Sequence, residues 1–216
     1  SIAEMVEGAA AFGHEYVAIT DHATGPGMVG GVGLDDDRIR EQMSAIRSVE
    51  DEAEIDVFAG IEANIGPDGT VSVEDDVLAD LDLVVASPHA SLDGDGTERL
   101  ITAAKHPSVD IIGHPTGRRL NERKGMDVDI ERLATVAADH ETALEVNADP
   151  RRLDLPGQAI RNAIDAGATV VVNTDAHRTT SYEHIRYGVR TARRGWATAD
   201  DILNARDADG IRAFLD

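Results

Sequence analysis

The segment VVVNTDAH, residues 170–177, joins three valines to an aspartate and a histidine two positions apart. A short apolar run rich in β-branched residues predicts a buried strand. Asp175 and His177 follow where such a strand would end. Polar residues commonly lie at strand ends, so one such case carries little information. The same arrangement recurs along the chain, and this recurrence decides the fold class.

Five further apolar runs end close to a polar or ionisable side chain, and helical spacing separates the runs. The runs are YVAIT before His22, VFAGIEANI around Glu62, DLVVASPHA to His89, DIIGHPT to His114 and ALEVNA to Asn147. The helical segments cover residues 2–12, 35–53, 97–105, 130–140, 158–166 and, with a turn near Gly195, 182–215.

Alternating strands and helices predict βαβ units and a parallel sheet with both faces covered. Such a sheet is either open and doubly wound or closed into a barrel. An open sheet would spread the polar strand ends along a line, whereas a (β/α) barrel brings them to one rim, where active sites form. The pattern therefore favours an α/β barrel.

Histidines and carboxylates that converge in a chain without cysteine are the ligand set of Zn²⁺ or Mn²⁺. More than four candidates predict more than one ion, and a carboxylate such as Glu62 can bridge two. Paired ions clamp the attacking and leaving oxygens of a phosphoryl transfer and lower the pKa of water. Arg118, four residues after His114, could hold a phosphate in bidentate fashion. The remaining histidines are interpreted as structural: His14, His106, His140 and His184.

Residues 25–30, GPGMVG, fit the dinucleotide-binding pattern G-x-G-x-x-G. In that motif the helix begins within the glycines and its N-terminus meets the pyrophosphate. Here further glycines and the acidic residues 35–37 delay the helix, and Pro26 removes a backbone donor. We therefore predict a mobile rim loop and no nucleotide cofactor.

The length of 216 residues predicts one domain, and no apolar run is long enough for a membrane span. The first residues lack a signal-peptide pattern, so we expect a cytoplasmic protein. The net charge is −21, from 41 acidic and 20 basic residues, and the only lysines are Lys105 and Lys124. Dispersed acid and scarce lysine favour a halophilic protein, since concentrated salt screens the self-repulsion of such a body.

The series ITDHA, GIEANI, VVASPHAS, IIGHPTGR, LEVNADPRRLDLP and VVNTDAH resembles the PHP (polymerase and histidinol phosphatase) superfamily. More narrowly, it resembles the C-terminal PHP domain of family X DNA polymerases, over essentially the whole chain as a single domain, residues 1–216. The resemblance implies a distorted seven-stranded TIM-like barrel with a trinuclear metal centre. It also implies phosphoester hydrolysis, with 3′–5′ exonuclease or DNA 3′-end processing, usually with Mn²⁺, and a polymerase domain as partner.

The resemblance also implies roles for individual residues. His22 and His177 would share one outer metal, and Asp175 would bind the other. Glu62 would bridge, completing the middle site with His89 and His114. Glu62, Asp175 and Arg118 are thus the candidate catalytic residues, and Arg118 and Arg119 the candidates for the substrate phosphate.

One departure from the family pattern is large, because members begin with a strand bearing an H-x-H pair of ligands. This chain begins at Ser1, in the first predicted helix, so we expect a fragment that lacks the first strand and binds fewer than three metals. Besides a nuclease domain, two alternatives are open. One is a phosphatase of a small phosphoester such as histidinol phosphate or a nucleotide. The other is a structural barrel with degraded metal sites.

Overall fold

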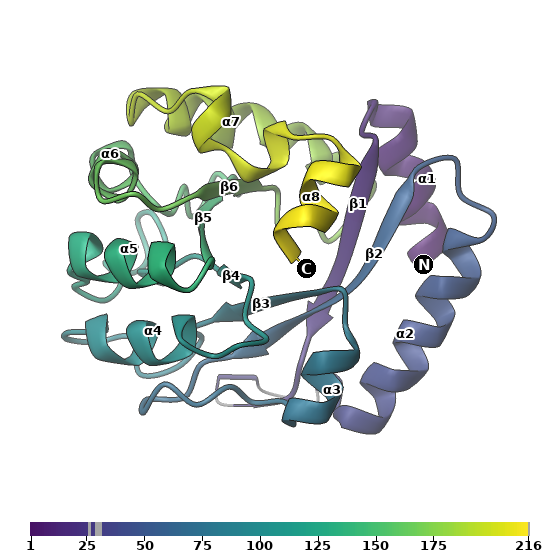
Figure 1. Cartoon of the computed structure of the whole chain (residues 1–216), viewed down its shortest axis with the longest axis horizontal. Helices are drawn as coiled ribbons and strands as arrows, with labels where there is room; N and C mark the ends of the chain where they lie inside the picture. Colours follow the sequence, from purple (N-terminus) through teal and green to yellow (C-terminus); the bar gives the residue numbers. More distant parts are fainter. Residues whose placement is uncertain (26, 29–31, 216) are drawn as a thin grey trace.

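The computed structural model describes residues 1–25, 27–28 and 32–215. Part of the glycine-rich segment 25–30, predicted to be a mobile rim loop, lies outside the described residues. The chain alternates strands and helices, as the sequence pattern predicts (Figure 1).

Six parallel strands form one sheet in which the spatial order follows the chain order. They are β1 (Tyr16–His22), β2 (Asp56–Asn64), β3 (Leu83–Ser87), β4 (Ile111–Ile112), β5 (Ala143–Asn147) and β6 (Val170–Asn173). The sheet curls into a half-barrel with helices on its outer face (Figure 1). The predicted barrel class is therefore confirmed, in the distorted form in which β1 and β6 do not pair with each other within the described residues.

Five of the helices match predicted segments to within a few residues, whereas the predicted segment 182–215 divides into α7 and α8 with 3-10 turns between them. The helices are α1 (Ile2–Phe12), α2 (Asp36–Glu50), α3 (Asp75–Asp80), α4 (Thr97–Ala104), α5 (Ile130–Asp139), α6 (Gly157–Asp165), α7 (Ile185–Arg194) and α8 (Ala208–Leu215). Short 3-10 helices, η1 (Thr179–His184), η2 (Ala199–Asp201) and η3 (Leu203–Ala205), flank α7 and precede α8. Local sequence explains the helix starts, since Ser1 forms a capping box with Glu4, and Asp35 and Asp129 cap α2 and α5. The short helix α3 was not predicted.

Apolar side chains fill both sides of the curled sheet. The larger cluster lies between the sheet and the helices. A smaller cluster lies inside the curl, where Phe58, Val85 and Val171 contact Leu203 and Ile211 of the C-terminal segment. The C-terminal segment therefore covers part of the barrel interior.

The two edge strands of the sheet, β6 and β1, differ in how their outer backbone groups are hydrogen-bonded. At β6 the side-chain amide of Asn204 pairs with Val172, accepting from its N–H at 3.0 Å and donating to its carbonyl at 2.6 Å. The amide thereby takes the place of a neighbouring strand. At β1 no further strand pairs within the described residues, and a cavity of about 1090 Å³ separates this edge from β6.

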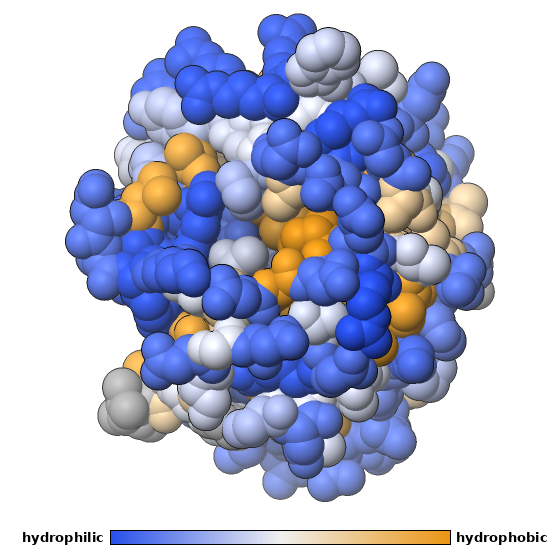
Figure 2. Space-filling view, turned by 90° about the vertical axis from the view of Figure 1, so that its left-hand side faces the viewer, coloured by the Kyte–Doolittle hydropathy of each residue, from blue (hydrophilic) through white to orange (hydrophobic). Residues whose placement is uncertain are grey.

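The outer surface is mainly hydrophilic. In the space-filling view, hydrophilic residues cover most of one side of the molecule, with a smaller hydrophobic area near the middle (Figure 2). Within the described residues, no helix combines the length and the apolar character that crossing a membrane requires.

Candidate metal centre

The predicted ligands gather at the carboxyl ends of the strands, as a parallel barrel requires. The register of the sheet brings the first two together, because His22 at the end of β1 is the partner of Glu62 in β2. His89 and His114 follow β3 and β4 by two residues each. Asp175 and His177 lie in the loop after β6.

Glu62 lies at the middle of this group. Its Oε2 is 2.6 Å from Nδ1 of His22, and its Oε1 is 3.5 Å from Nε2 of His89 and 3.7 Å from Nδ1 of His114. One ligand atom each from His22, Glu62 and His89 lie within 4.8 Å of one another, close enough to hold a single ion. His114 adjoins this trio from the next strand end.

The imidazole nitrogens that face Glu62 fit a metal ion better than they fit hydrogen bonding. Nδ1 of His22 and Nε2 of His89 are buried and form no hydrogen bond of regular geometry within the described residues. The opposite nitrogen of His89 contacts Oδ1 of Asn64 at 2.7 Å. A hydrogen bond there fixes a tautomer with the proton on Nδ1 and leaves Nε2 with a free lone pair, as in metal-bound histidines.

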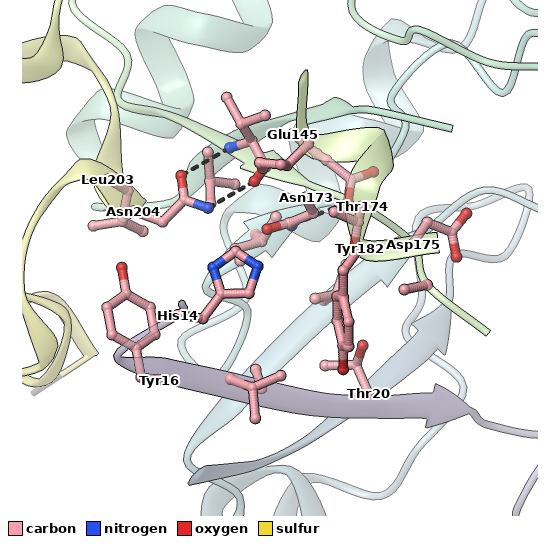
Figure 3. A pocket seen from close by; sticks show the side chains of 18 of the residues that line it. His14, Tyr16, Thr20, Glu145, Asn173, Thr174, Asp175, Tyr182, Leu203 and Asn204 are labelled. Atoms are coloured by element: carbon pink, nitrogen blue, oxygen red, sulfur yellow. Dashed lines mark hydrogen bonds between the residues drawn. The ribbon is translucent and has the colours of Figure 1, made fainter. Parts of the chain in front are cut away.

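Glu145 is a site residue that the sequence pattern did not predict. Its buried carboxylate accepts from the backbone N–H of His114 at 2.6 Å and lies 3.5 Å from Nδ1 of the same residue. The side-chain amides of Asn147 and Asn173 donate to its two oxygens. The available signal was a carboxylate inside the apolar run ALEVN. Figure 3 shows Glu145 beside Asn173 at the wall of the cavity.

Asp175 and His177 stand on the other side of the centre. Asp175 has a left-handed backbone, with φ of 51°, and its Oδ2 accepts from Nδ2 of Asn147 at 3.2 Å. The His177 ring is mostly exposed and lies 5.8 Å from the His22 ring between centroids. The pairing of His22 with His177 that the family resemblance implies is therefore compatible with this arrangement.

A second residue that was not predicted is Arg152, which the sequence could not separate from its neighbour Arg151. The Arg152 side chain is largely buried, with Nε 3.7 Å from Oδ2 of Asp175. Its Nη1 is buried and has no hydrogen-bond partner within the described residues. The side chain of Arg151 instead forms an ion pair with Asp149.

The two arginines predicted to hold a phosphate contact other protein groups. Arg118 donates from Nε to the carbonyl of Arg152 at 3.0 Å and from Nη2 to the carbonyl of Leu153. A bidentate grip on phosphate by Arg118 would need these bonds to be exchanged. Arg119 is partly exposed and lies 3.4 Å from Glu122.

The electrostatics of the centre favour a bound cation. Burial alone would raise the pKa of Glu62, but contacts with His22 and His89 and the charge of His114 outweigh it and hold that pKa well below its ordinary value. Burial, then the charges of Glu62 and Glu145, raise the pKa of Asp175. Because three carboxylates converge here, a divalent ion would relieve their mutual repulsion.

The interpretation of four other histidines as structural agrees with their contacts. His14 stacks on Phe12 and lies edge-on to Tyr182 at the cavity wall (Figure 3), and burial lowers its pKa. His106 contacts Asp75, His140 caps α5, and His184 precedes α7.

Comparison with known proteins gives relatives over the whole chain. No family model matches the sequence. The sequence is 41% identical over 219 aligned residues to the DNA polymerase/3′–5′ exonuclease PolX of Bacillus subtilis, covering all of this chain and 38% of that protein. It is 34% identical over 173 residues to a "probable phosphatase" of Shewanella piezotolerans, covering 74% of this chain and 67% of that protein. The chain belongs to the PHP superfamily.

Structural comparison gives the same fold. The crystal structure of histidinol phosphate phosphatase from Lactococcus lactis, complexed with zinc, L-histidinol and phosphate, superposes with a TM-score of 0.54. The match covers 89% of this chain and 86% of the phosphatase chain. Because the sequence identity is 16%, the match supports the fold alone. This PHP chain spans 38% of the length of the Bacillus subtilis relative. The activities of the rest of that protein are therefore not assigned to this chain.

Proposed function

We propose that this PHP chain is a metal-dependent phosphoesterase that processes DNA 3′ ends, as the 3′–5′ exonuclease part of a family X DNA polymerase. The observation that carries the proposal is the convergence of one ligand atom each from His22, Glu62 and His89 within 4.8 Å, where the imidazole nitrogens that face the carboxylate form no hydrogen bond of regular geometry within the described residues. The 41% identity between the whole of this chain and part of the Bacillus subtilis PolX protein supports the substrate class.

The proposed ligands are His22, Glu62, His89, His114, Asp175 and His177, and the proposed ions are Mn²⁺ or Zn²⁺. Bound ions of this kind supply Lewis-acid stabilisation of the phosphoryl group and a nucleophile at neutral pH. Glu62 is placed to contact more than one ion, because its two oxygens face different histidines.

Protein side chains supply the rest of the chemistry. Arg152 lies beside Asp175, and its Nη1, which has no hydrogen-bond partner within the described residues, suits it to a substrate phosphate oxygen. Arg118 holds the loop that carries Arg152 by donating to two of its carbonyls, and it could add a contact to phosphate from Nη1. Arg119 lies on the surface beside them, where it could contact a longer substrate.

The proposal includes a seventh strand, supplied by residues outside these 216, that pairs with the free edge of β1. The cavity between β1 and β6 supports the presence of this strand. The backbone groups on the outer edge of β1, which pair with no strand in the described residues, could form its hydrogen bonds. Ligands on such a strand would complete the outer metal sites. A longer polypeptide that includes the upstream residues should therefore exceed the 216-residue chain in metal content and activity.

Substrate comparison tests the proposal. With Mn²⁺, a 3′-recessed DNA duplex is incubated beside histidinol phosphate and a nucleoside monophosphate, using both chain lengths and the Glu62→Gln variant. Release of 3′-terminal nucleotides by the longer chain, abolished in Glu62→Gln, is the expected result.

A second candidate function is the hydrolysis of a small phosphoester, which the relationship to the Shewanella phosphatase favours. Faster turnover of histidinol phosphate or the nucleotide than of DNA would establish this alternative. No turnover of any substrate by either length would instead identify a structural PHP module.

A further inference from the structure

Helix α7 is a basic element in an acidic protein. Its ten residues, IRYGVRTARR, contain four arginines and no acid, while the whole chain carries a net charge of −21. Arg186, Arg190 and Arg193 recur at positions i, i+4 and i+7, which places them on one face of the helix. The helical rise sets them about 6 Å and 4.5 Å apart along the axis. All three are exposed.

The exposed arginines on the two preceding long helices are paired with carboxylates. On α5, Arg132 pairs with Glu98, and on α6, Arg161 pairs with Asp165. On α7 only Arg186 has a carboxylate partner, Glu183 at 3.5 Å, and Arg190 and Arg193 form no ion pair within the described residues. Two guanidinium groups of the basic face are thus free to bind an anion from outside.

Trp196 extends this face with an aromatic ring. It follows the helix directly, beyond Gly195, and is 76% exposed. Its backbone is left-handed, with φ of 62°, and its N–H donates to the carbonyl of Arg193 at 3.1 Å. A large aromatic side chain that is exposed directly after the helix has the surface that stacking on a base requires.

One cavity is lined both by residues of the metal centre and by residues of α7. The cavity lined by Glu62, Asp175 and His177 is also lined by Val189 and Arg193 of α7. The chain that leaves His177 passes through η1 directly into α7. A strand lying on α7 would therefore lie along the same cavity that the metal centre lines.

We propose that Arg190, Arg193 and Trp196 form a docking surface for single-stranded nucleic acid. The arginines contact successive phosphates, and the indole stacks on a base. Only one part of this proposal rests on the proposed function, namely that the bound strand leads toward the metal centre. An acidic segment of a partner protein is the competing occupant of this surface. Such a segment would leave the indole without a base to stack on.

Intrinsic fluorescence tests the docking surface, because Trp196 is the only tryptophan in the chain. A 12-nucleotide oligothymidylate is titrated in EDTA, so that binding is measured without hydrolysis, at KCl concentrations where circular dichroism shows a folded chain. We expect quenching of Trp196. In Arg190→Ala/Arg193→Ala the dissociation constant should rise at least tenfold. The slope of log affinity against log salt should fall by about 1.4, or 0.7 for each lost phosphate contact.

The matched control is Arg132→Ala/Arg161→Ala, which makes the same charge change at paired arginines and should bind as the parent does. Trp196→Ala, followed by anisotropy of a labelled oligonucleotide, should bind about 5- to 100-fold more weakly. Equal losses in both double variants, an absence of quenching, or quenching by polyglutamate instead of the oligonucleotide would overturn the proposal. Hydrolysis of a small phosphodiester by Arg190→Ala/Arg193→Ala separates this failure from failure of the metal centre.

Discussion

Asn64 shows how a residue outside the ligand set controls one inside it. Its side-chain oxygen contacts Nδ1 of His89, while its amide donates to the carbonyls of Ala23 and Thr24. The amide is thereby held in one orientation, which makes the oxygen the partner of the imidazole. The tautomer of His89 thus depends on a loop that starts at the end of β1.

The variant Asn64→Ala should therefore lower metal affinity about 10- to 100-fold, because the His89 ring loses its orienting partner. Calorimetric titration with Zn²⁺ measures the change. Ser72→Ala is the control, since the Ser72 hydroxyl contacts Asn64 but not His89. An equal loss in Ser72→Ala would attribute the effect to the loop and not to the histidine.

The residues of the centre were predictable where a polar side chain interrupts the end of an apolar run. His22, Glu62, His89, His114, Asp175 and His177 follow from that pattern, although their roles as ligands stay predictions. Glu145 escaped, although it occupies the same place in β5 as Glu62 in β2, two residues before the strand end, because the sequence pattern indicates Asn147 as the polar residue that ends this run. Arg152 escaped because the turn after β5, and not the sequence, decides which of two adjacent arginines faces Asp175.

Elements near the rim are shorter than their sequence pattern suggests. DIIGHPT reads as a full strand, yet β4 has two residues, because His114 adopts a positive φ of 25° and turns the chain away. The helix α3 was missed, since six residues with three acids give too little apolar periodicity. The C-terminal segment, expected to be helical, breaks into α7, 3-10 turns and α8, and Asn204 in that break closes the edge of β6.

A partly buried acid before β4 gives a pH-dependent prediction at this scale. Burial raises the pKa of Asp110 to about 6, although its Oδ2 accepts from the N–H of Val84 in β3 at 2.7 Å. Because the folded pKa exceeds the unfolded one, ionisation of Asp110 destabilises the fold above pH 6, and this cost fades as the pH falls toward 4.

The variant Asp110→Asn keeps an oxygen for Val84 and removes the charge. We expect its free energy of unfolding to exceed that of the parent by about 1–3 kcal/mol at pH 8, with most of this gain gone near pH 4. Urea denaturation at the two pH values measures the difference. A gain of the same size at both values would show that the ionisation of Asp110 is not its cause.

For the whole molecule, the fold class and the net charge are the two features that the sequence indicates directly. The fold class was predictable because alternating strands and helices leave few topologies. The edge of β1, which no strand pairs with in the described part of the chain, could be placed only through the family resemblance. The charge of −21 was equally visible, but its effect depends on the solvent.

The halophilic interpretation remains a prediction, and its test is thermal. The Debye length falls from about 10 Å at 0.1 M salt to about 3 Å at 1 M, which screens repulsion among the dispersed acids. The midpoint of thermal unfolding should therefore rise steeply from 0.1 M to 2 M KCl. A midpoint that does not change over this range would show that the acidic surface is not an adaptation to salt.

Metal binding by the chain and its variants tests the central claim most directly. The 216-residue protein, purified without chelator, is analysed for bound Mn²⁺ and Zn²⁺ beside His89→Ala, His114→Ala and the control His14→Ala. We predict fewer than three ions per chain, a loss of most of the metal in the first two variants and parental content in His14→Ala. Equal metal content in all four proteins, or a loss in His14→Ala as large as that in His89→Ala, would contradict the assignment of the metal centre.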